Sequence, residues 1–168
     1  MKYFLYAILY IVILGILCFP FGRLLARHDF RTDRFPFASL PFEQNGKLYE
    51  RVGIRRWQNL VPDISRVFPQ IVPKKALEKN LNVPGLYRMV QETCVAELTH
   101  GLLCLAGFVP VWIWPGTGGV ILYLIYVLFG NLPFILIQRY NRPRLLRLLQ
   151  AAERRERKSH ERTDSQLQ

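Results

Sequence analysis

The sequence predicts an all-α membrane protein with about three transmembrane helices, a cytoplasmic amphipathic segment and a basic C-terminal helix. Residues 3–21 and 120–137 are uncharged apolar runs, and each is close to the ~20 residues that a helix needs to cross hydrocarbon. Charge is also segregated, because Glu97 is the only fully charged residue between Glu92 and Gln138. We expect residues 1–168 to form a single membrane domain.

The first element, residues 3–21, is predicted to be an uncleaved transmembrane helix. A secretory signal has its positive charge in front and a small-residue cleavage site behind. Here only Lys2 precedes the run, and no A-x-A-like site follows Phe21. The arginines follow the run instead, at Arg23, Arg27, Arg31 and Arg34.

Residues 22–83 are predicted to be a cytoplasmic segment that folds against the membrane surface. The segment is dense in aromatic residues and prolines, whereas disordered linkers are poor in aromatics. Ile54, Trp57 and Val61 recur at helical spacing, while the arginines between them face elsewhere. Two interpretations remain open: an interfacial helix anchored by its tryptophan, or an amphipathic piece of a small cytoplasmic fold.

Residues 84–114 are predicted to form a helix that enters and crosses the membrane. Proline suits a first helical turn, so we expect the helix to start near Pro84. The apolar part, residues 101–114, is too short to span alone, so a full crossing must include the turn that carries Glu97 and His100. A re-entrant segment is the alternative.

Residues 120–137 are predicted to be the last transmembrane helix. Pro133 lacks a backbone donor and lies close to Asn131, so we expect a kink or a locally opened carbonyl there. Residues 138–168 follow as a basic cytoplasmic tail, which we expect to be helical until about Lys158.

The distribution of basic residues predicts the orientation in the cell membrane. The flank after the first run and the tail are rich in Lys and Arg, whereas the turn at residues 115–119 is uncharged. The positive-inside rule then places the N-terminus outside and the C-terminus in the cytoplasm. The net charge of +11 fits attraction to anionic lipids, about 1 kcal/mol per charge near the surface. No zinc-finger or RNP signature is present, so we expect no nucleic-acid binding.

Glu97 and His100 are the candidate catalytic residues. They stand three residues apart and share one helical face with Thr93 and Cys104. A carboxylate in a span costs roughly 2.5–3.5 kcal/mol, so we expect Glu97 to pair with His100 and orient it as a general base. The alternative is that both lie at headgroup depth, where polar residues are tolerated. With a single E-x-x-H copy and no further carboxylate in the spans, we expect no metal site.

A cluster of polar residues at the end of the last span is a candidate anion site. Arg139, Arg142 and Arg144 surround Tyr140 and Asn141. Snorkelling arginines commonly just anchor a helix. Three guanidinium groups beside a phenol and a carboxamide could instead hold phosphates.

Three sequence blocks resemble one known family. The blocks are F-E-Q-N-G-K-L-Y-E-R-V-G-I-R-R-W (residues 42–57), E-T-C-V-A-E-L-T-H (92–100) and N-L-P-F-I-L-I-Q-R-Y-N-R-P-R-L (131–145). Their order and spacing are similar to those of the glycosyl-4,4'-diaponeurosporenoate acyltransferases, small bacterial membrane proteins of staphyloxanthin-type carotenoid biosynthesis. The first helix and residues 65–81 show no such similarity.

The resemblance implies transfer of a fatty acyl group to the sugar 6-hydroxyl of a glycosylated carotenoid acid. The donor would be an acyl thioester, on acyl-CoA or an acyl carrier, and no cofactor is implied. His100, oriented by Glu97, would take the hydroxyl proton, and the arginines at 139–144 would hold the donor phosphates. The candidate substrate-binding residues are Trp57, Asn131, Gln138, Arg139, Tyr140, Asn141, Arg142 and Arg144. Among these, Asn131, Gln138 or Tyr140 could donate to the oxyanion.

Two other functions remain open from the residues alone. One is an acyltransferase that acts on another glycolipid. The other is a non-catalytic membrane subunit or scaffold of a lipid or pigment pathway, in which Glu97 and His100 would serve helix pairing. Three spans make a thin bundle, so a homo-oligomer is also possible.

Overall fold

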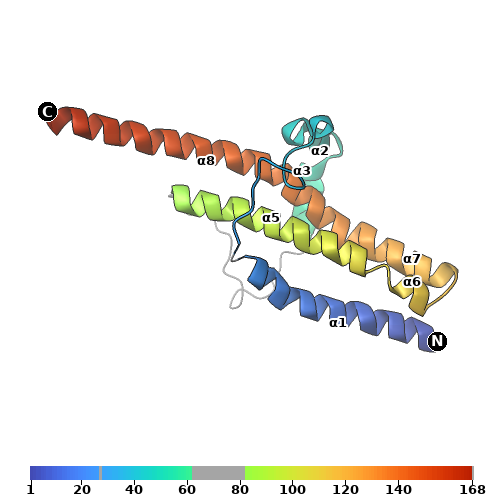
Figure 1. Ribbon diagram of the computed structural model, residues 1–168. Helices are drawn as coiled ribbons and strands as arrows, with labels where there is room; N and C mark the ends of the chain where they lie inside the picture. Colours follow the sequence, from blue (N-terminus) through green and yellow to red (C-terminus); the bar gives the residue numbers. More distant parts are fainter. Residues whose placement is uncertain (27, 62–81, 168) are drawn as a thin grey trace.

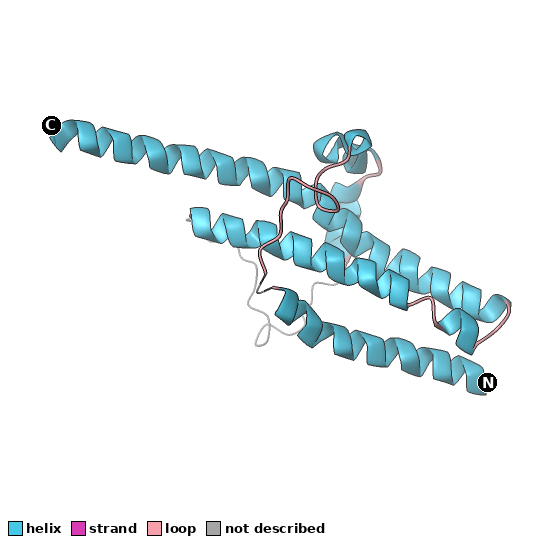
Figure 2. Ribbon diagram, viewed as in Figure 1, coloured by secondary structure: helices cyan, strands magenta, loops and turns pink. Residues whose placement is uncertain are grey.

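The computed structural model describes residues 1–26, 28–61 and 82–167, and every regular element in these ranges is helical (Figure 2). The elements are α1 (Lys2–Leu25), η1 (Pro41–Gly46), α2 (Lys47–Arg51), α3 (Ile54–Trp57), η2 (Gln58–Leu60), α5 (Val83–Ala106), α6 (Pro110–Ile113), α7 (Thr117–Ile125), η3 (Tyr126–Asn131) and α8 (Leu132–Leu167). Three stretches are long and apolar enough to cross a membrane: Lys2–Leu25, Val83–Ile113 and Thr117–Ser165. The predicted all-α membrane fold is confirmed.

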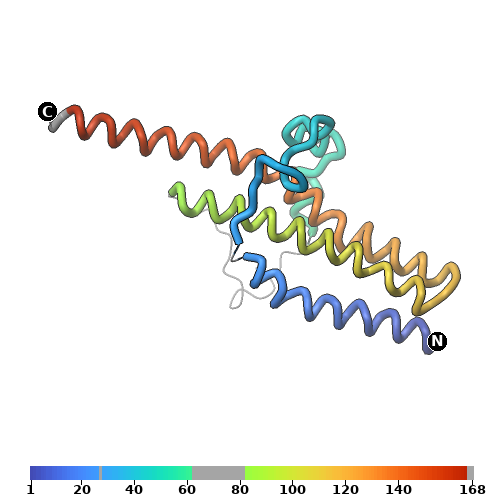
Figure 3. Tube along the Cα trace, in the orientation of Figure 1, coloured from blue at the N-terminus to red at the C-terminus, as the bar shows by residue number. Residues whose placement is uncertain are grey.

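The three long stretches lie side by side in a bundle (Figure 1). The N-terminus lies at the end of the bundle that carries the α6–α7 turn, and the C-terminus lies beyond the opposite end (Figure 3). α5 and α8 make the most extensive helix pair of the bundle. Near the start of α5, Leu86 and Val90 pack on Leu149 of α8. The chain therefore passes along the bundle three times.

The second stretch runs the whole length of the bundle. α5 begins at Val83, where the Asn82 side chain accepts a hydrogen bond from the Gly85 backbone N–H at 3.0 Å, a common helix cap. α5 ends at Ala106, and α6 resumes at Pro110 before the turn into α7. By length and composition the whole stretch, Val83–Ile113, is long and apolar enough for the predicted full crossing.

A glycine allows α6 and α7 to meet closely at this turn. A Cβ on Gly119 would lie 2.2 Å from the Trp114 carbonyl oxygen and 2.9 Å from that of Pro110. Such distances are far below van der Waals contact, so any larger residue at 119 would push the two helices apart.

The third stretch is a continuous helix with one irregular turn. α7 passes through the π-helical turn η3 into α8 without a loop, and Pro133 follows directly after this turn. The predicted local irregularity near Asn131 and Pro133 is confirmed. The helix runs through residues 137–138, where the apolar run gives way to the basic tail, and continues to Leu167. The helix also does not stop near Lys158, although every described side chain after Ala152 is exposed.

Residues 28–61 form a compact module that packs on α5 and α8. The chain leaves α1, passes α5, where the Phe30 backbone exchanges two hydrogen bonds with Gln91 (2.7 and 3.2 Å), and reaches α8 (Figure 3). Ile54 is fully buried and Trp57 packs beside it against Tyr140 and its neighbours on α8. The amphipathic piece therefore belongs to a small fold, and its apolar side faces protein. Residues 62–81 of the predicted cytoplasmic segment lie outside the described ranges.

A left-handed turn in this module sets the position of Glu43. Gln44, Asn45 and Gly46 have φ values of 50°, 54° and 96°, a conformation that asparagine and especially glycine tolerate. A Cβ on Gly46 would lie 3.3 Å from the Tyr140 carbonyl oxygen. The turn therefore holds the module close to α8 and directs the preceding Glu43 inward, where it is 2% exposed.

The orientation can be tested with single cysteines at the two ends of the bundle. Thr117 at the α6–α7 turn and Ser159 near the C-terminus are both exposed. With the N-terminus outside, we expect Thr117→Cys to react with an impermeant maleimide in intact cells, and Ser159→Cys to react only after permeabilisation. We choose Thr117 over the neighbouring Gly118 for the cysteine, because a Cβ on Gly118 would lie 2.3 Å from the Trp114 ring.

The unsubstituted protein is the control for labelling of its own cysteines, of which Cys94 is buried and Cys18 and Cys104 are half-buried. The reverse pattern, with Ser159→Cys labelled in intact cells and Thr117→Cys protected, would contradict the orientation.

Candidate active site

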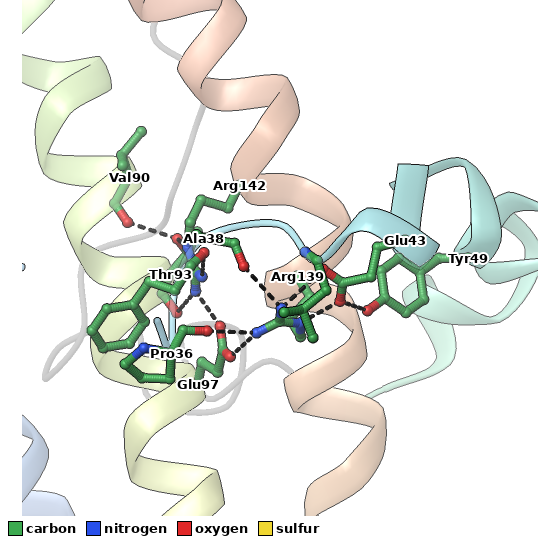
Figure 4. Close-up of polar contacts among 11 residues, drawn as sticks. Pro36, Ala38, Glu43, Tyr49, Val90, Thr93, Glu97, Arg139 and Arg142 are labelled. Atoms are coloured by element: carbon green, nitrogen blue, oxygen red, sulfur yellow. Dashed lines mark hydrogen bonds and ion pairs between the residues drawn. The ribbon is translucent and has the colours of Figure 1, made fainter. Parts of the chain in front are cut away.

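Arg139 is the centre of a buried ion network that joins three parts of the chain (Figure 4). Its side chain is 12% exposed. Nε and Nη2 donate to the Glu43 carboxylate at 2.5 and 2.9 Å, and Nη1 donates to Glu97 Oε1 at 2.5 Å. The remaining two hydrogen bonds go to the carbonyl oxygens of Pro36 (2.9 Å) and Ala38 (3.2 Å). A guanidinium has five N–H donors, and here each one has a partner.

Arg142 completes the network one turn further along α8. Its side chain is 2% exposed, and Nη2 donates to Glu97 Oε2 at 2.5 Å. Nε and Nη2 also bind Thr93, through Oγ1 at 2.9 Å and the carbonyl oxygen at 3.0 Å, and Nη1 donates to the Phe37 carbonyl oxygen at 2.8 Å. Two carboxylates and two guanidinium groups therefore neutralise each other, which a buried charge requires.

The predicted pairing of Glu97 with His100 is wrong. The two residues lie on the same helix, but each Glu97 oxygen binds an arginine of α8. The reason is electrostatic, since an arginine stays charged even when buried and is stable there only beside an anion. Glu97 thus pairs α5 with α8, the helix-pairing role that was the alternative to catalysis.

The phosphate cradle stays a prediction, and two of its three arginines are already paired with carboxylates. Arg139 and Arg142 point into the protein and their charges are already neutralised. Arg144 is exposed, but its guanidinium lies 4.8 Å from the centre of the Tyr140 ring and hydrogen-bonds the Tyr140 hydroxyl. These residues fasten the module to α8.

Glu43 and Tyr49 belong to the network but were not predicted. Tyr49 Oη donates to Glu43 Oε1, and the Leu40 backbone N–H donates to Oε2 at 2.6 Å. Burial raises the pKa of Glu43, but the hydrogen bonds from Arg139, Tyr49 and Leu40 outweigh it and lower that pKa from 4.5 to about 2. Burial and the neighbouring carboxylate raise the pKa of Tyr49 to about 12. Charge balance is the sequence feature that could have pointed to Glu43, because buried arginines need nearby carboxylates.

His100 lies on the side of this network towards the α6–α7 turn, in a separate polar contact. Its Nδ1 is 3.0 Å from Asn131 Oδ1, and the Nδ2 of Asn131 donates to the Tyr126 carbonyl oxygen at 3.0 Å. The imidazole stacks on the Phe134 ring, with centroids 4.4 Å apart and planes 7° from parallel. Within the described ranges no hydrogen bond to Nε2 is found. The structure thus brings together two predicted site residues, His100 and Asn131.

Of the remaining predicted site residues, Asn141 is half-buried and makes no side-chain hydrogen bond to any described residue, and the others fall into two groups. Gln138 is half-buried, makes no side-chain hydrogen bond to any described residue, and lies seven residues after Asn131 on the same helical face. Tyr140 is 1% exposed, and its hydroxyl accepts from Arg55 Nε at 3.1 Å, on the side of α8 that faces the module. Trp57 packs in the same cluster. Gln138 therefore shares the helical face that carries Asn131, whereas Tyr140 and Trp57 are not part of the His100 contact.

Two hollows flank the site. A polar cavity of about 350 Å³ borders the network, and its lining includes Glu43, Arg139 and Arg142 together with Asp33, Asn45 and Arg147. An apolar groove of about 240 Å³ lies between α1 and α5, and its lining includes Leu17, Phe21 and Leu103. Leu103 follows His100 by three residues and so shares its face of α5. His100 is not part of the lining of either hollow, because its ring lies against Asn131 and Phe134.

The depressed pKa of Glu43 predicts how stability depends on pH. The carboxylate is stabilised in the folded protein, so its contribution, on the order of 3 kcal/mol, is present above pH 4.5 and is lost as the pH falls from 4.5 towards 2. Thermal unfolding in detergent between pH 6 and pH 3 should therefore show a falling melting temperature.

Glu43→Gln is the matched variant, because it has no proton to gain. We expect it to be less stable at neutral pH and to lose less stability on acidification than the unsubstituted protein. Parallel pH profiles for the two proteins would contradict a charged Glu43 in the network.

Comparison with known proteins identifies the family. Residues 33–151 match the family model described as glycosyl-4,4'-diaponeurosporenoate acyltransferase. Proteins of that name from Staphylococcus aureus strains MRSA252 and N315 are each 33% identical to this chain over 129 residues, which is 75% of this chain and 75% of theirs. No solved structure matches the chain. The chain therefore belongs to the glycosyl-4,4'-diaponeurosporenoate acyltransferase family and is an acyltransferase.

Proposed function

We propose that this acyltransferase moves a fatty acyl group from a thioester to a sugar hydroxyl of a glycosylated carotenoid acid. The names of its relatives support the acceptor. An apolar acceptor and an acyl chain would both reach the protein from the bilayer, and the three apolar stretches fit that route. The donor, acyl-CoA or an acyl carrier, would approach from the cytoplasm.

The observation that carries the proposal is the hydrogen bonding of the two candidate bases, Glu97 and His100. Both oxygens of Glu97 are bound by guanidinium groups, so neither is open to a substrate hydroxyl. His100 binds Asn131 through Nδ1 and has no described partner at Nε2. An imidazole with one nitrogen held and the other available is the arrangement that general-base catalysis needs. We therefore assign the base to His100 without the help of Glu97.

The chemistry balances as one direct transfer. Nε2 of His100 accepts the hydroxyl proton while the sugar oxygen attacks the thioester carbonyl carbon. The tetrahedral intermediate collapses with cleavage of the carbon–sulfur bond, and the proton passes from the imidazolium to the departing thiolate. The products are an acyl ester of the sugar and a free thiol.

Gln138 is the best candidate for stabilising the developing oxyanion. The sequence also suggested Asn131 and Tyr140, but the Asn131 amide already donates to the Tyr126 carbonyl, and the Tyr140 hydroxyl binds residues of the module. The amide of Gln138 is not committed to a described residue and lies four residues after Phe134, on which the imidazole stacks. An amide donor in a preorganised site is worth about 3–4 kcal/mol.

The apolar groove between α1 and α5 supports the placement of the acyl chain. Its lining is apolar, with Leu17 and Phe21 from α1 and Leu103 from α5, which suits an alkyl chain.

The proposal is tested with purified protein in lipid vesicles, a labelled acyl-CoA and a glycosylated carotenoid acid. We expect His100→Gln to lower kcat by about 10²–10⁴-fold and Gln138→Met to lower it by about 10²–10³-fold. Asn59→Ala, which removes an exposed amide that lines neither hollow, is the control and should leave kcat unchanged.

Undiminished ester formation by His100→Gln, at equal amounts of folded protein, would contradict the assignment of the base. Release of free fatty acid without transfer to the sugar would contradict the acceptor.

A further inference from the structure

We propose that the π-helical turn η3 selects the tautomer of His100, through Asn131, and so makes Nε2 the basic nitrogen. Asn131 is then a positioning residue for the base. The inference deepens the proposed function, and its catalytic consequence rests on His100 being that base.

The first step is the orientation of the Asn131 amide. The Tyr126 carbonyl oxygen can only accept a hydrogen bond, and it lies 3.0 Å from the amide nitrogen, Nδ2. A flipped amide would bring two oxygens together. Both residues belong to η3, at its first and last positions. The local backbone therefore fixes the amide, with Oδ1 directed away from Tyr126.

The second step follows from the chemistry of the pair. Oδ1 is an acceptor, and it lies 3.0 Å from Nδ1 of His100. The ring nitrogen must then be the donor, so the proton of a neutral imidazole sits on Nδ1. The lone pair is left on Nε2, for which no partner is found among the described residues. In this tautomer Nε2, the ring nitrogen that does not contact Asn131, can accept a proton.

The third step is the plane of the ring. Phe134 follows Asn131 by three residues and lies on the same helical face, and its ring stacks on the imidazole at 4.4 Å. The hydrogen bond fixes one nitrogen and the stacking fixes the ring plane. Together the two contacts fix the direction in which Nε2 points relative to α8.

Among the described residues, none but Asn131 is found as a partner of Nδ1. On α5, Glu97 one turn earlier is bound to arginines, and Cys104 one turn later is a half-buried thiol. On η3 and α8, the nearest groups are Asn131 itself and the ring of Phe134. Asn131 is thus the group that sets the tautomer.

Without the Asn131 amide, His100 should no longer be held in the tautomer that carries its proton on Nδ1. Free histidine in water favours the form with the proton on Nε2, and in that form Nε2 is not a base. Groups that orient a catalytic or metal-binding histidine from behind commonly contribute about 10–100-fold. A catalytic histidine of a serine protease that is held in the wrong tautomer loses about 10⁴-fold in kcat.

The direct test is NMR of the full-length protein in lipid nanodiscs with ¹⁵N-labelled histidine, at a pH where the rings are neutral. The spectrum of His100→Gln identifies the His100 signals among those of His28 and His160. We expect the unsubstituted protein to carry the His100 proton on Nδ1. Asn131→Ala should show a shift towards the Nε2 proton, with kcat lowered about 10–100-fold and KM within about twofold.

Phe134→Leu and Asn59→Ala are the comparison variants. Phe134→Leu keeps the amide, so we expect it to keep the Nδ1 proton. Asn59→Ala alters an exposed asparagine and should match the unsubstituted protein in both measurements.

Two results would overturn the inference whatever the activities: a His100 proton on Nε2 in the unsubstituted protein, or the Nδ1 proton retained in folded Asn131→Ala. Should Asn131→Ala not fold, the spectrum of the unsubstituted protein decides alone. The expected tautomer together with a fully active His100→Gln would instead remove the proposed catalytic base and leave the tautomer selection standing.

Discussion

The fold depends on the neutralisation of two buried arginines. Arg139 and Arg142 lie on α8 where the apolar stretch ends, and they are stable there because Glu97 of α5 and Glu43 of the module supply matching charge. Each arginine also binds backbone carbonyls of the segment 36–38. The network thus fixes two helices and the module at one level, although the segments are far apart in sequence. Such a network specifies an arrangement more than it adds net stability.

The network also explains the separation of structural and chemical roles. Glu97 and His100 are three residues apart, and helical spacing alone suggested one device. In the structure the carboxylate faces arginines, whereas the imidazole faces Asn131 and Phe134. The acid holds α5 against α8, and this contact keeps the imidazole opposite the π-helical turn. A change at Glu97 would therefore reach His100 through helix packing rather than through a direct bond.

Sequence reasoning recovered what depends on composition and local chemistry. The three apolar stretches, the helix start at Val83–Pro84 and the irregular turn before Pro133 follow from run length, proline and hydropathy. Contacts between elements were missed, because spacing shows which residues share a face but not what that face meets. Glu43 lay in a segment read as surface-bound, and only its left-handed turn brings it to Arg139. The helical tail beyond Lys158 was missed because its polar sequence shows no apolar face.

The most direct test of this account is a double-mutant cycle for Glu97 and Arg139 in the unfolding of the detergent-solubilised protein. Each single change, Glu97→Gln or Arg139→Met, should be strongly destabilising, because it leaves a buried charge without its partner. The two side chains meet at 2.5 Å in a site that is nearly closed to solvent, so we predict a coupling free energy above about 1 kcal/mol. Additivity within about 0.5 kcal/mol would show that the two residues do not interact, and would contradict the network on which the fold and the site depend.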